Sequence, residues 1–120
     1  MYRFPKDLDL TLLVGAHIPQ LRFGIGDVQL IFSCQLHICI QGEIDIFLGD
    51  KVIANWVQGS LWSSLDFQKI YNKDVLSAHL LNDQILEIQL KDNLKIMIYD
   101  NSEHYESLQI WFPDGSEIIV

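Results

Sequence analysis

The chain has 120 residues, 49% of them hydrophobic, and its 16 acidic side chains against 8 lysines and arginines give a net charge of −8. This length fits one domain, and the hydrophobic content suffices for a packed core, which excludes intrinsic disorder. Because a surface of this charge repels phosphate groups and anionic lipids, we expect neither nucleic acid nor membrane as a partner.

The N-terminal region favours a cytoplasmic protein. Asp7 and Asp9 precede its only apolar run, and that run is too short for a secretory signal, although 9–14 could form a helical turn. No apolar run elsewhere is long enough to span a bilayer. Cys34 and Cys39 would point to opposite faces of one strand, so they cannot easily pair and fit a reducing compartment as free thiols.

An internal repeat dominates the rest of the chain. Residues 28–40 (VQLIFSCQLHICI) and 86–98 (LEIQLKDNLKIMI) align at a spacing of 58 positions, with apolar residues at the same alternating positions in both copies. A period of two predicts strands with one buried face, and the Lys-Asp-Asn of 91–93 is typical of a turn. We therefore predict one β-hairpin in each half, 28–32 with 36–40 and 86–90 with 94–98.

The repeat extends more weakly in both directions. Residues 16–18 resemble 78–80, which gives His17 and His79 equivalent positions, and the apolar alternation of 43–46 resembles that of 107–110. Both halves then reach a turn, at 49–50 and at 113–115, and end on an apolar segment. The second half differs by an insertion at 99–104.

Between the halves, 59–71 predicts a helix of about ten residues, with Ser60 as its N-cap and Leu61, Leu65 and Ile70 near helical spacing. We predict a single domain, with repeat halves at about 15–56 and 75–120 and a connector at about 57–74. Since an isolated hairpin is marginally stable, the two halves should pack their apolar faces together into a mainly β fold, a β-sandwich or half-open barrel.

The sequence shows no catalytic or metal-binding motif. The four histidines lack a metal-ligand spacing, and there is no G-x-S-x-G, phosphate-binding glycine loop or C-x-x-C. We expect no enzymatic activity, cofactor or metal. Five aromatic residues could line a small-molecule pocket or belong to the core: Trp56, Trp62, Phe67, Trp111 and Phe112.

Charge is unevenly distributed along the chain. Residues 72–120 hold nine acids and three bases, against seven and five in 1–71, so the acidic second half suits a basic partner. The insertion and the residues after it combine Asp100, Glu103, His104, Tyr105 and Glu106. A carboxylate beside a histidine can act as a base or bind metal, but here a binding surface or a structured turn is the preferred interpretation.

The second half also resembles a family of small bacterial proteins of unassigned function. In that family a hairpin with the pattern D-D-G-x-L-x-I precedes a Tyr-Glu-Ser segment and a terminal D-G-x-x-I-x-V strand. The matching residues here are Lys91-Asp92-Asn93-Leu94, Tyr105-Glu106-Ser107 and 114–120. The first half is similar at 40–43, so the resemblance covers most of the chain from Gly15 onward. Asn93 replaces the usual glycine, and Ile44 stands where an aromatic residue is common.

Proteins of this kind resemble the immunity proteins of secreted bacterial toxins, including those of contact-dependent growth inhibition. The resemblance implies a monomer or weak homodimer that blocks the active site of a basic toxin, preferably a ribonuclease-like nuclease domain. We predict these partner-binding residues: Asp83, Asp100, Glu103, His104, Tyr105, Glu106 and Trp111. The alternative is a small-molecule-binding or housekeeping β domain that uses the aromatic residues as a pocket.

Overall fold

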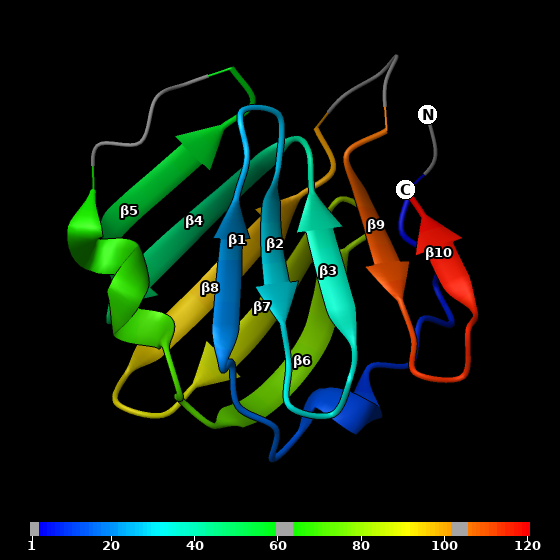
Figure 1. Ribbon diagram of the computed structural model, residues 1–120, viewed down its shortest axis with the longest axis horizontal. Helices are drawn as coiled ribbons and strands as arrows, with labels where there is room; N and C mark the ends of the chain where they lie inside the picture. The colour runs from blue at the N-terminus through cyan, green and yellow to red at the C-terminus, as the bar shows by residue number, and fades with distance from the viewer. Residues whose placement is uncertain (1–2, 60–63, 102–105) are drawn as a thin grey trace.

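A computed structural model describes residues 3–59, 64–101 and 106–120, and within these ranges the chain forms ten strands and two short 3-10 helices (Figure 1). The first half contains η1 (Thr11–Leu13), β1 (Gln20–Phe23), β2 (Val28–Ile31), β3 (His37–Ile40), β4 (Glu43–Leu48) and β5 (Lys51–Val57). The second half contains η2 (Leu65–Ile70), β6 (Val75–Asn82), β7 (Ile85–Leu90), β8 (Leu94–Tyr99), β9 (Leu108–Trp111) and β10 (Glu117–Ile119). No helix of the described residues is long and apolar enough to cross a membrane.

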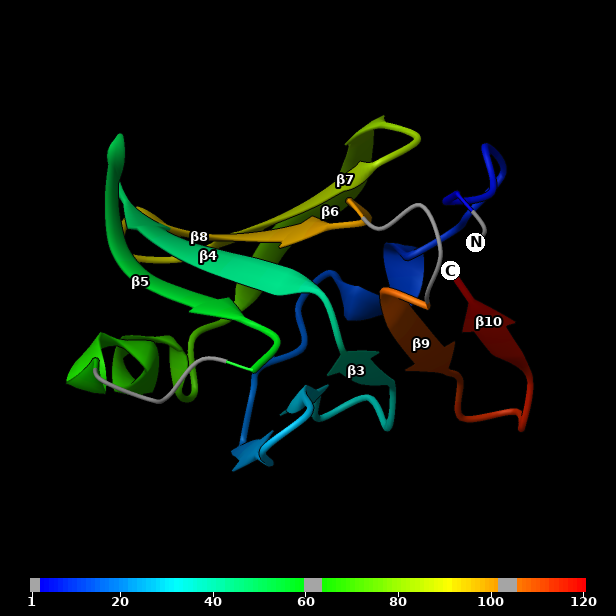
Figure 2. The same cartoon turned by 90° about the horizontal axis from the view of Figure 1, so that it is seen from above.

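The strands form two antiparallel five-stranded sheets that face each other (Figure 2). Sheet A has the order β1-β2-β3-β9-β10, and sheet B has the order β5-β4-β8-β7-β6. The predicted mainly β fold, a sandwich or half-open barrel made of two related halves, is confirmed. Sheet A is nearer the viewer in Figure 1, with the strands of sheet B crossing behind it.

Both predicted hairpins are present. In the first, Val28 pairs with Ile40, and in the second Leu86 pairs with Ile98, so the 58-residue spacing carries over into the strand register. The second hairpin turns through Asp92 and Asn93, both with a φ of 64°. Two consecutive positive φ values match the twist of a hairpin, and asparagine and aspartate tolerate this conformation better than other non-glycine residues.

The two halves exchange strands, which the sequence did not indicate. β4 and β5 of the first half complete sheet B beside β8, and β9 and β10 of the second half complete sheet A beside β3. Ile44 pairs with Ile98 and Leu108 pairs with Ile40, so 43–46 and 107–110 are equivalent, as their alternation indicated. Each sheet therefore repeats the strand order of the other, with β1 equivalent to β6 and β5 equivalent to β10.

One apolar core lies between the sheets and joins residues of both halves. Four of its members occupy equivalent positions of the two repeated hairpins, and none of them is more than 4% exposed: Leu36, Ile38, Leu94 and Ile96. Leu94 and Ile96 alternate along β8 with exposed or half-buried neighbours, which is the pattern of a sheet with one buried face, whereas Ile38 in β3 is followed by the buried Cys39. The burial of each such side chain stabilises the fold by about 1.5–3 kcal/mol.

Non-strand segments close the two open sides of the sandwich. On one side η2 lies beside β5 and β1 (Figure 1), where Phe67 packs edge-on against Phe23 with ring centroids 6.1 Å apart. On the other side the N-terminal segment inserts Phe4, Leu10 and Leu13 into the core. η1 and η2 precede the equivalent strands β1 and β6, so the closing segments follow the same repeat.

Two local predictions were wrong in detail. The helix predicted at 59–71 is a six-residue 3-10 helix, capped by the Ser64 hydroxyl, which accepts a hydrogen bond from the amide of Asp66 at 3.1 Å; Ser60 and Leu61 lie outside the described residues. His17 and His79 are not equivalent. In sheet B, His79 pairs with Glu87 on β7. The equivalent pair in sheet A is Arg22 with Gln29, so the counterpart of His79 is Arg22, whereas His17 lies before β1 begins.

Truncation of the equivalent core residues tests this packing. We expect Ile38→Ala and Ile96→Ala each to lower the free energy of unfolding by about 2–5 kcal/mol, because each leaves a cavity in a fully buried site. Lys51→Ala, at an exposed position of the edge strand β5, should change it by less than about 0.5 kcal/mol. Urea denaturation measures all three, and equal losses would contradict the assigned faces.

Candidate functional site

The N-terminal segment 5–11, called the strap below, runs along one open side of the sandwich. It begins after Phe4, whose amide donates to the carbonyl oxygen of Asp83 at 2.9 Å. The strap has β6 on one flank and the β9–β10 hairpin on the other, and a groove lies along each flank. In Figures 1 and 2 it is the blue segment near β10.

The groove between the strap and the β9–β10 hairpin, called the acidic groove below, has a volume of about 370 Å³. Apolar side chains of Leu8, Phe112 and Ile118 contribute to its lining, together with Pro5 and Ser116. The remaining lining residues are four acids: Asp7, Asp9, Asp114 and Glu117. Among the residues that the structure describes, no lysine, arginine or histidine lines this groove, so its described lining combines apolar surface with four carboxylates.

Two of these carboxylates are fixed by turns of the chain. Asp114 accepts hydrogen bonds from the amide and the hydroxyl of Ser116, at 2.8 and 2.6 Å. Asp9 accepts in the same way from the amide and the hydroxyl of Thr11. These hydrogen bonds lower the pKa of both carboxyl groups, because each bond stabilises the charged form, so both stay ionised at neutral and mildly acidic pH.

Glu117 is positioned from the outer face of sheet A. Its carboxylate accepts a hydrogen bond from the indole nitrogen of Trp111 at 3.0 Å, and the two residues are partners in the β9–β10 register. Trp111 also packs edge-on against His37, with ring centroids 6.3 Å apart. A tryptophan face beside a carboxylate offers both an aromatic and an ionic contact to a cation.

The groove suits cation binding better than catalysis. A general acid or base works best with a pKa near the working pH, whereas Asp9 and Asp114 are shifted away from it. Among the described residues, no group of three or more histidine, cysteine, aspartate or glutamate side chains is arranged to hold a metal ion.

The structure brings together few of the residues predicted to bind a partner. Glu103, His104 and Tyr105 lie outside the described residues. Asp83 is exposed in the β6–β7 turn beside the start of the strap. Glu106 is exposed two residues before β9, where its carboxylate accepts a hydrogen bond from the side-chain amide of Gln109 at 3.2 Å. Trp111 lies at the far end of β9, beside the acidic groove.

Asp100 requires a correction, because its side chain is fully buried and cannot meet a partner in this conformation. Its carboxylate accepts from the hydroxyl of Ser107 at 2.6 Å and pairs with Arg3 at 3.1 Å. Its amide donates to the carbonyl oxygen of Gln84 at 2.8 Å. Asp100 therefore ties the end of β8 to the beginning of β9, the β6–β7 turn and the N-terminus.

Sequence reasoning missed the four acids of the groove. From the sequence, Asp7 and Asp9 counted only against a signal sequence and for a helical turn, and Asp114 and Glu117 only as parts of the last turn and strand; none was predicted to bind a partner. The groove forms between the two ends of the chain, and no local pattern shows that these ends meet. The Asp-x-Thr pattern at 9–11 and the Asp-x-Ser pattern at 114–116 indicate turns that fix the aspartate carboxylates. No sequence pattern indicates that these two turns lie close together.

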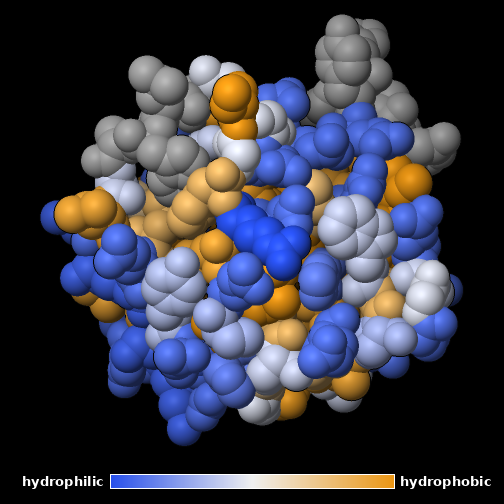
Figure 3. All heavy atoms as spheres, viewed as in Figure 1, coloured by the Kyte–Doolittle hydropathy of each residue, from blue (hydrophilic) through white to orange (hydrophobic). Residues whose placement is uncertain are grey.

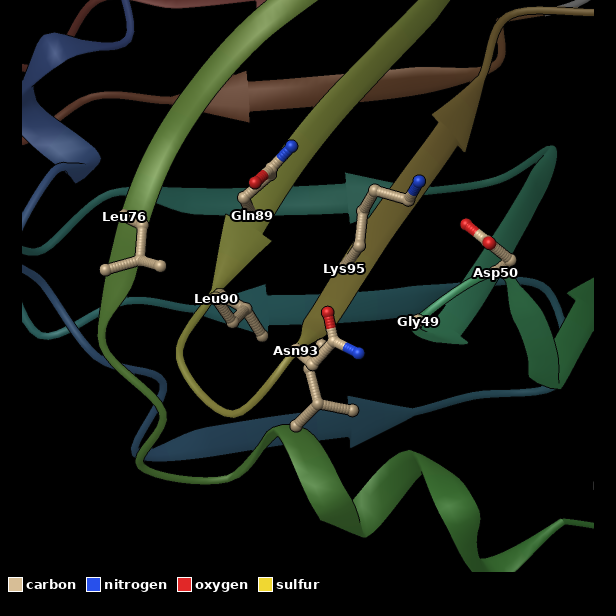
Figure 4. Close-up of a pocket in the computed structure, with 8 residues that line it drawn as sticks. Gly49, Asp50, Leu76, Gln89, Leu90, Asn93 and Lys95 are labelled. Atoms are coloured by element: carbon tan, nitrogen blue, oxygen red, sulfur yellow. The ribbon is translucent and has the colours of Figure 1, made fainter.

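Two other grooves carry mixed charge. The groove between the strap and β6, of about 450 Å³, is lined by Lys6, Asp9 and His79 among apolar residues. A third, of about 350 Å³, lies at the β7–β8 turn and the neighbouring β4–β5 turn, and Lys95 and Asp50 lie on the same side of it (Figure 4). On the outer face of sheet A, polar side chains predominate and apolar ones are scattered between them (Figure 3).

The aromatic residues do not share a pocket in the described part of the chain. Trp56 and Phe67 are core residues, 1% and 2% exposed, Phe112 lines the acidic groove, and Trp111 lies on the outer face of sheet A. Trp62 lies outside the described residues. This distribution gives no support to the alternative of an aromatic small-molecule site.

The buried cysteine is a structural thiol. Cys39 is 5% exposed and donates from its sulfur to Asp27 at 3.3 Å. Burial, together with the hydrogen bond and charge of Asp27, raises the pKa of the Cys39 thiol to about 12. Because the thiolate is the reactive form, this residue is unsuited to nucleophilic chemistry.

Comparisons of the chain with protein-family models, with curated proteins and with solved structures found no match. The resemblance to immunity proteins therefore stays a hypothesis.

Removal of the Asp100 carboxylate should destabilise the fold. We expect Asp100→Ala to lower the free energy of unfolding by about 1–3 kcal/mol, because the hydroxyl of Ser107 loses its acceptor and Arg3 its buried ion-pair partner. Asp83→Ala, at an exposed carboxylate, should cost less than about 0.5 kcal/mol. Thermal denaturation compares them; a loss as small for Asp100→Ala as for Asp83→Ala would argue against the buried role.

Thiol labelling tests the environment of Cys39. A thiol with a pKa of about 12 is almost fully protonated, so Cys39 should react with an aromatic disulfide reagent far more slowly than the half-buried Cys34. We expect one fast and one slow cysteine up to about pH 9 in the native protein, and two fast ones in denaturant. Fast labelling of both native thiols would show that Cys39 is accessible and that its assigned burial is wrong.

Proposed function

We propose that this protein is a non-enzymatic, immunity-type inhibitor that binds a basic protein toxin and blocks its active site. The observation that supports this proposal is the acidic groove, where four carboxylates and no basic side chain stand among the lining residues that the structure describes. The net charge of −8 supports the same proposal, because it steers a cationic partner toward the protein over distances of about 10 Å at about 0.1 M salt.

The chemistry of nucleases favours a ribonuclease-like toxin as the partner. An enzyme that cleaves a phosphodiester chain has a cleft that attracts phosphate groups, and carboxylates held at fixed positions can occupy that cleft instead. The turn-fixed Asp9 and Asp114 meet this requirement, because they are already ordered and lose little conformational freedom on binding. Such an inhibitor acts in the cytoplasm of the cell that it protects, as a monomer or weak homodimer.

Co-expression tests this function directly. The experiment requires a toxin-bearing reading frame directly beside the gene of this protein, and the toxic domain of that frame is expressed alone and together with this protein. We expect the domain to arrest growth, and this protein to restore growth and to form a complex that survives size-exclusion chromatography. The association rate should fall by roughly tenfold or more between about 50 and 500 mM salt, because charge steers the encounter.

An unrelated nuclease, which this protein is not expected to bind, serves as the control toxin. It should arrest growth whether or not this protein is present. Absence of any growth rescue and of any complex with the encoded domain would contradict the proposal. A neighbourhood of metabolic genes with no toxin-bearing frame would also count against it.

A further inference from the structure

We propose that the acidic groove binds an extended, lysine- or arginine-rich segment of a partner protein, which adds as a new strand to the free edge of β10. This inference rests on the proposed function for the identity of the partner, but the binding mode follows from the geometry of the edge and the groove.

The hydrogen-bond register identifies which groups the edge offers. The amide of Val120 donates to Leu108 and the amide of Leu108 donates to Val120, at 2.9 and 3.3 Å, and the amide of Phe112 donates to Ser116 at 2.9 Å. Alternate residues of an antiparallel strand face alternate sides, so Glu117 and Ile119 direct their N–H and C=O groups away from β9. No backbone hydrogen bond joins these groups to another described residue outside the sheet.

The groove along this edge fits long basic side chains. Lysine and arginine cover apolar surface with their aliphatic stems and keep their charged ends at a polar rim. Leu8, Phe112 and Ile118 supply the apolar surface, while the carboxylates of the strap and of the hairpin stand on opposite sides of it. On the outer face an added strand would also present alternate side chains to Glu117, whose carboxylate accepts a hydrogen bond from Trp111.

The internal repeat shows that the fold does not require this charge. The β4–β5 hairpin is equivalent to the β9–β10 hairpin, and Val52, which pairs with Phe47, occupies the place that Glu117 has opposite Trp111. A neutral residue therefore serves at the same position of the other sheet. Asp50, in the β4–β5 turn, corresponds to Asp114 and provides a matched control at the other end of the molecule.

A second copy of this chain is a poor occupant of the edge. Two chains of net charge −8 repel each other, and pairing through β10 would bring two sets of groove carboxylates together. A cationic segment gains from the same carboxylates, so charge complementarity selects a basic partner over self-association.

The test uses a synthetic heptapeptide of arginine as the probe and isothermal calorimetry at about 50 mM salt as the measurement. We expect Asp114→Asn with Glu117→Gln to weaken binding by at least about fivefold, since two contacts with the probe are lost. Asp50→Asn with Asp92→Asn makes the same change in net charge at exposed turns elsewhere and should weaken binding by less than about twofold. Both double variants retain amides that can accept the turn hydrogen bonds, and circular dichroism confirms that they fold.

A second probe separates strand addition from simple charge attraction. The same heptapeptide with alternate backbone nitrogens methylated keeps its charge but loses the donors of one edge. Two forms, methylated on odd or on even residues, block either edge in turn. Weaker binding of at least one form by about fivefold or more supports pairing with β10, because N-methyl groups remove the hydrogen bonds of a ladder.

Equal weakening by the two double variants would overturn the groove as the site, and equal affinity of all three peptides would overturn strand addition. Growth rescue by the groove double variant at wild-type level, with unchanged affinity for the toxin domain, would refute this inference while the proposed function stands. Peptide binding at the groove without any growth rescue would leave the binding mode supported and refute the immunity function.

Discussion

The exchange of strands between the halves is the constraint on which the rest of the structure depends. The pairing of β3 with β9 and of β8 with β4 places two strands of each half in the sheet of the other. An isolated hairpin is marginally stable in water, and here each hairpin is extended by foreign strands and covered by the opposite sheet. Neither half can bury its apolar face alone, so the halves are expected to fold together.

This arrangement also creates the candidate site. β9 and β10 cross into sheet A, where β10 becomes an edge strand beside the N-terminal strap. The beginning and the end of the chain thereby supply the two walls of the acidic groove. The equivalent edge strand, β5, has η2 beside it, so the groove marks a point where the two related halves differ. Two related halves are expected to differ in function at positions where the shared fold does not require a particular type of residue.

The sequence predicted the fold well where the signal is local or periodic. Alternation located both hairpins, and a spacing of 58 residues gave their equivalence, because the period of a strand fixes which side chains are buried. The exchange of strands was not predictable, because Ile44 and Leu108 have the same pattern whether they pair within their own half or with the other. The prediction of the binding residues was wrong at Asp100 for a related reason. The sequence suggests an exposed loop residue there, and only the contacts of its carboxylate with Arg3 and Ser107 show that it stabilises the fold.

Nuclear Overhauser effects between α-protons test the strand exchange most directly. Leu108 directs its backbone hydrogen bonds toward Val120, so its pairing with Ile40 is of the non-hydrogen-bonded kind, with Cα atoms about 4.5 Å apart and α-protons in close contact. The account predicts strong α-proton effects between Ile40 and Leu108 and between Ile38 and Ile110. If instead Ile40 gave such effects only with residues of its own half, the two sheets would be the two halves, and the acidic groove would not exist as described.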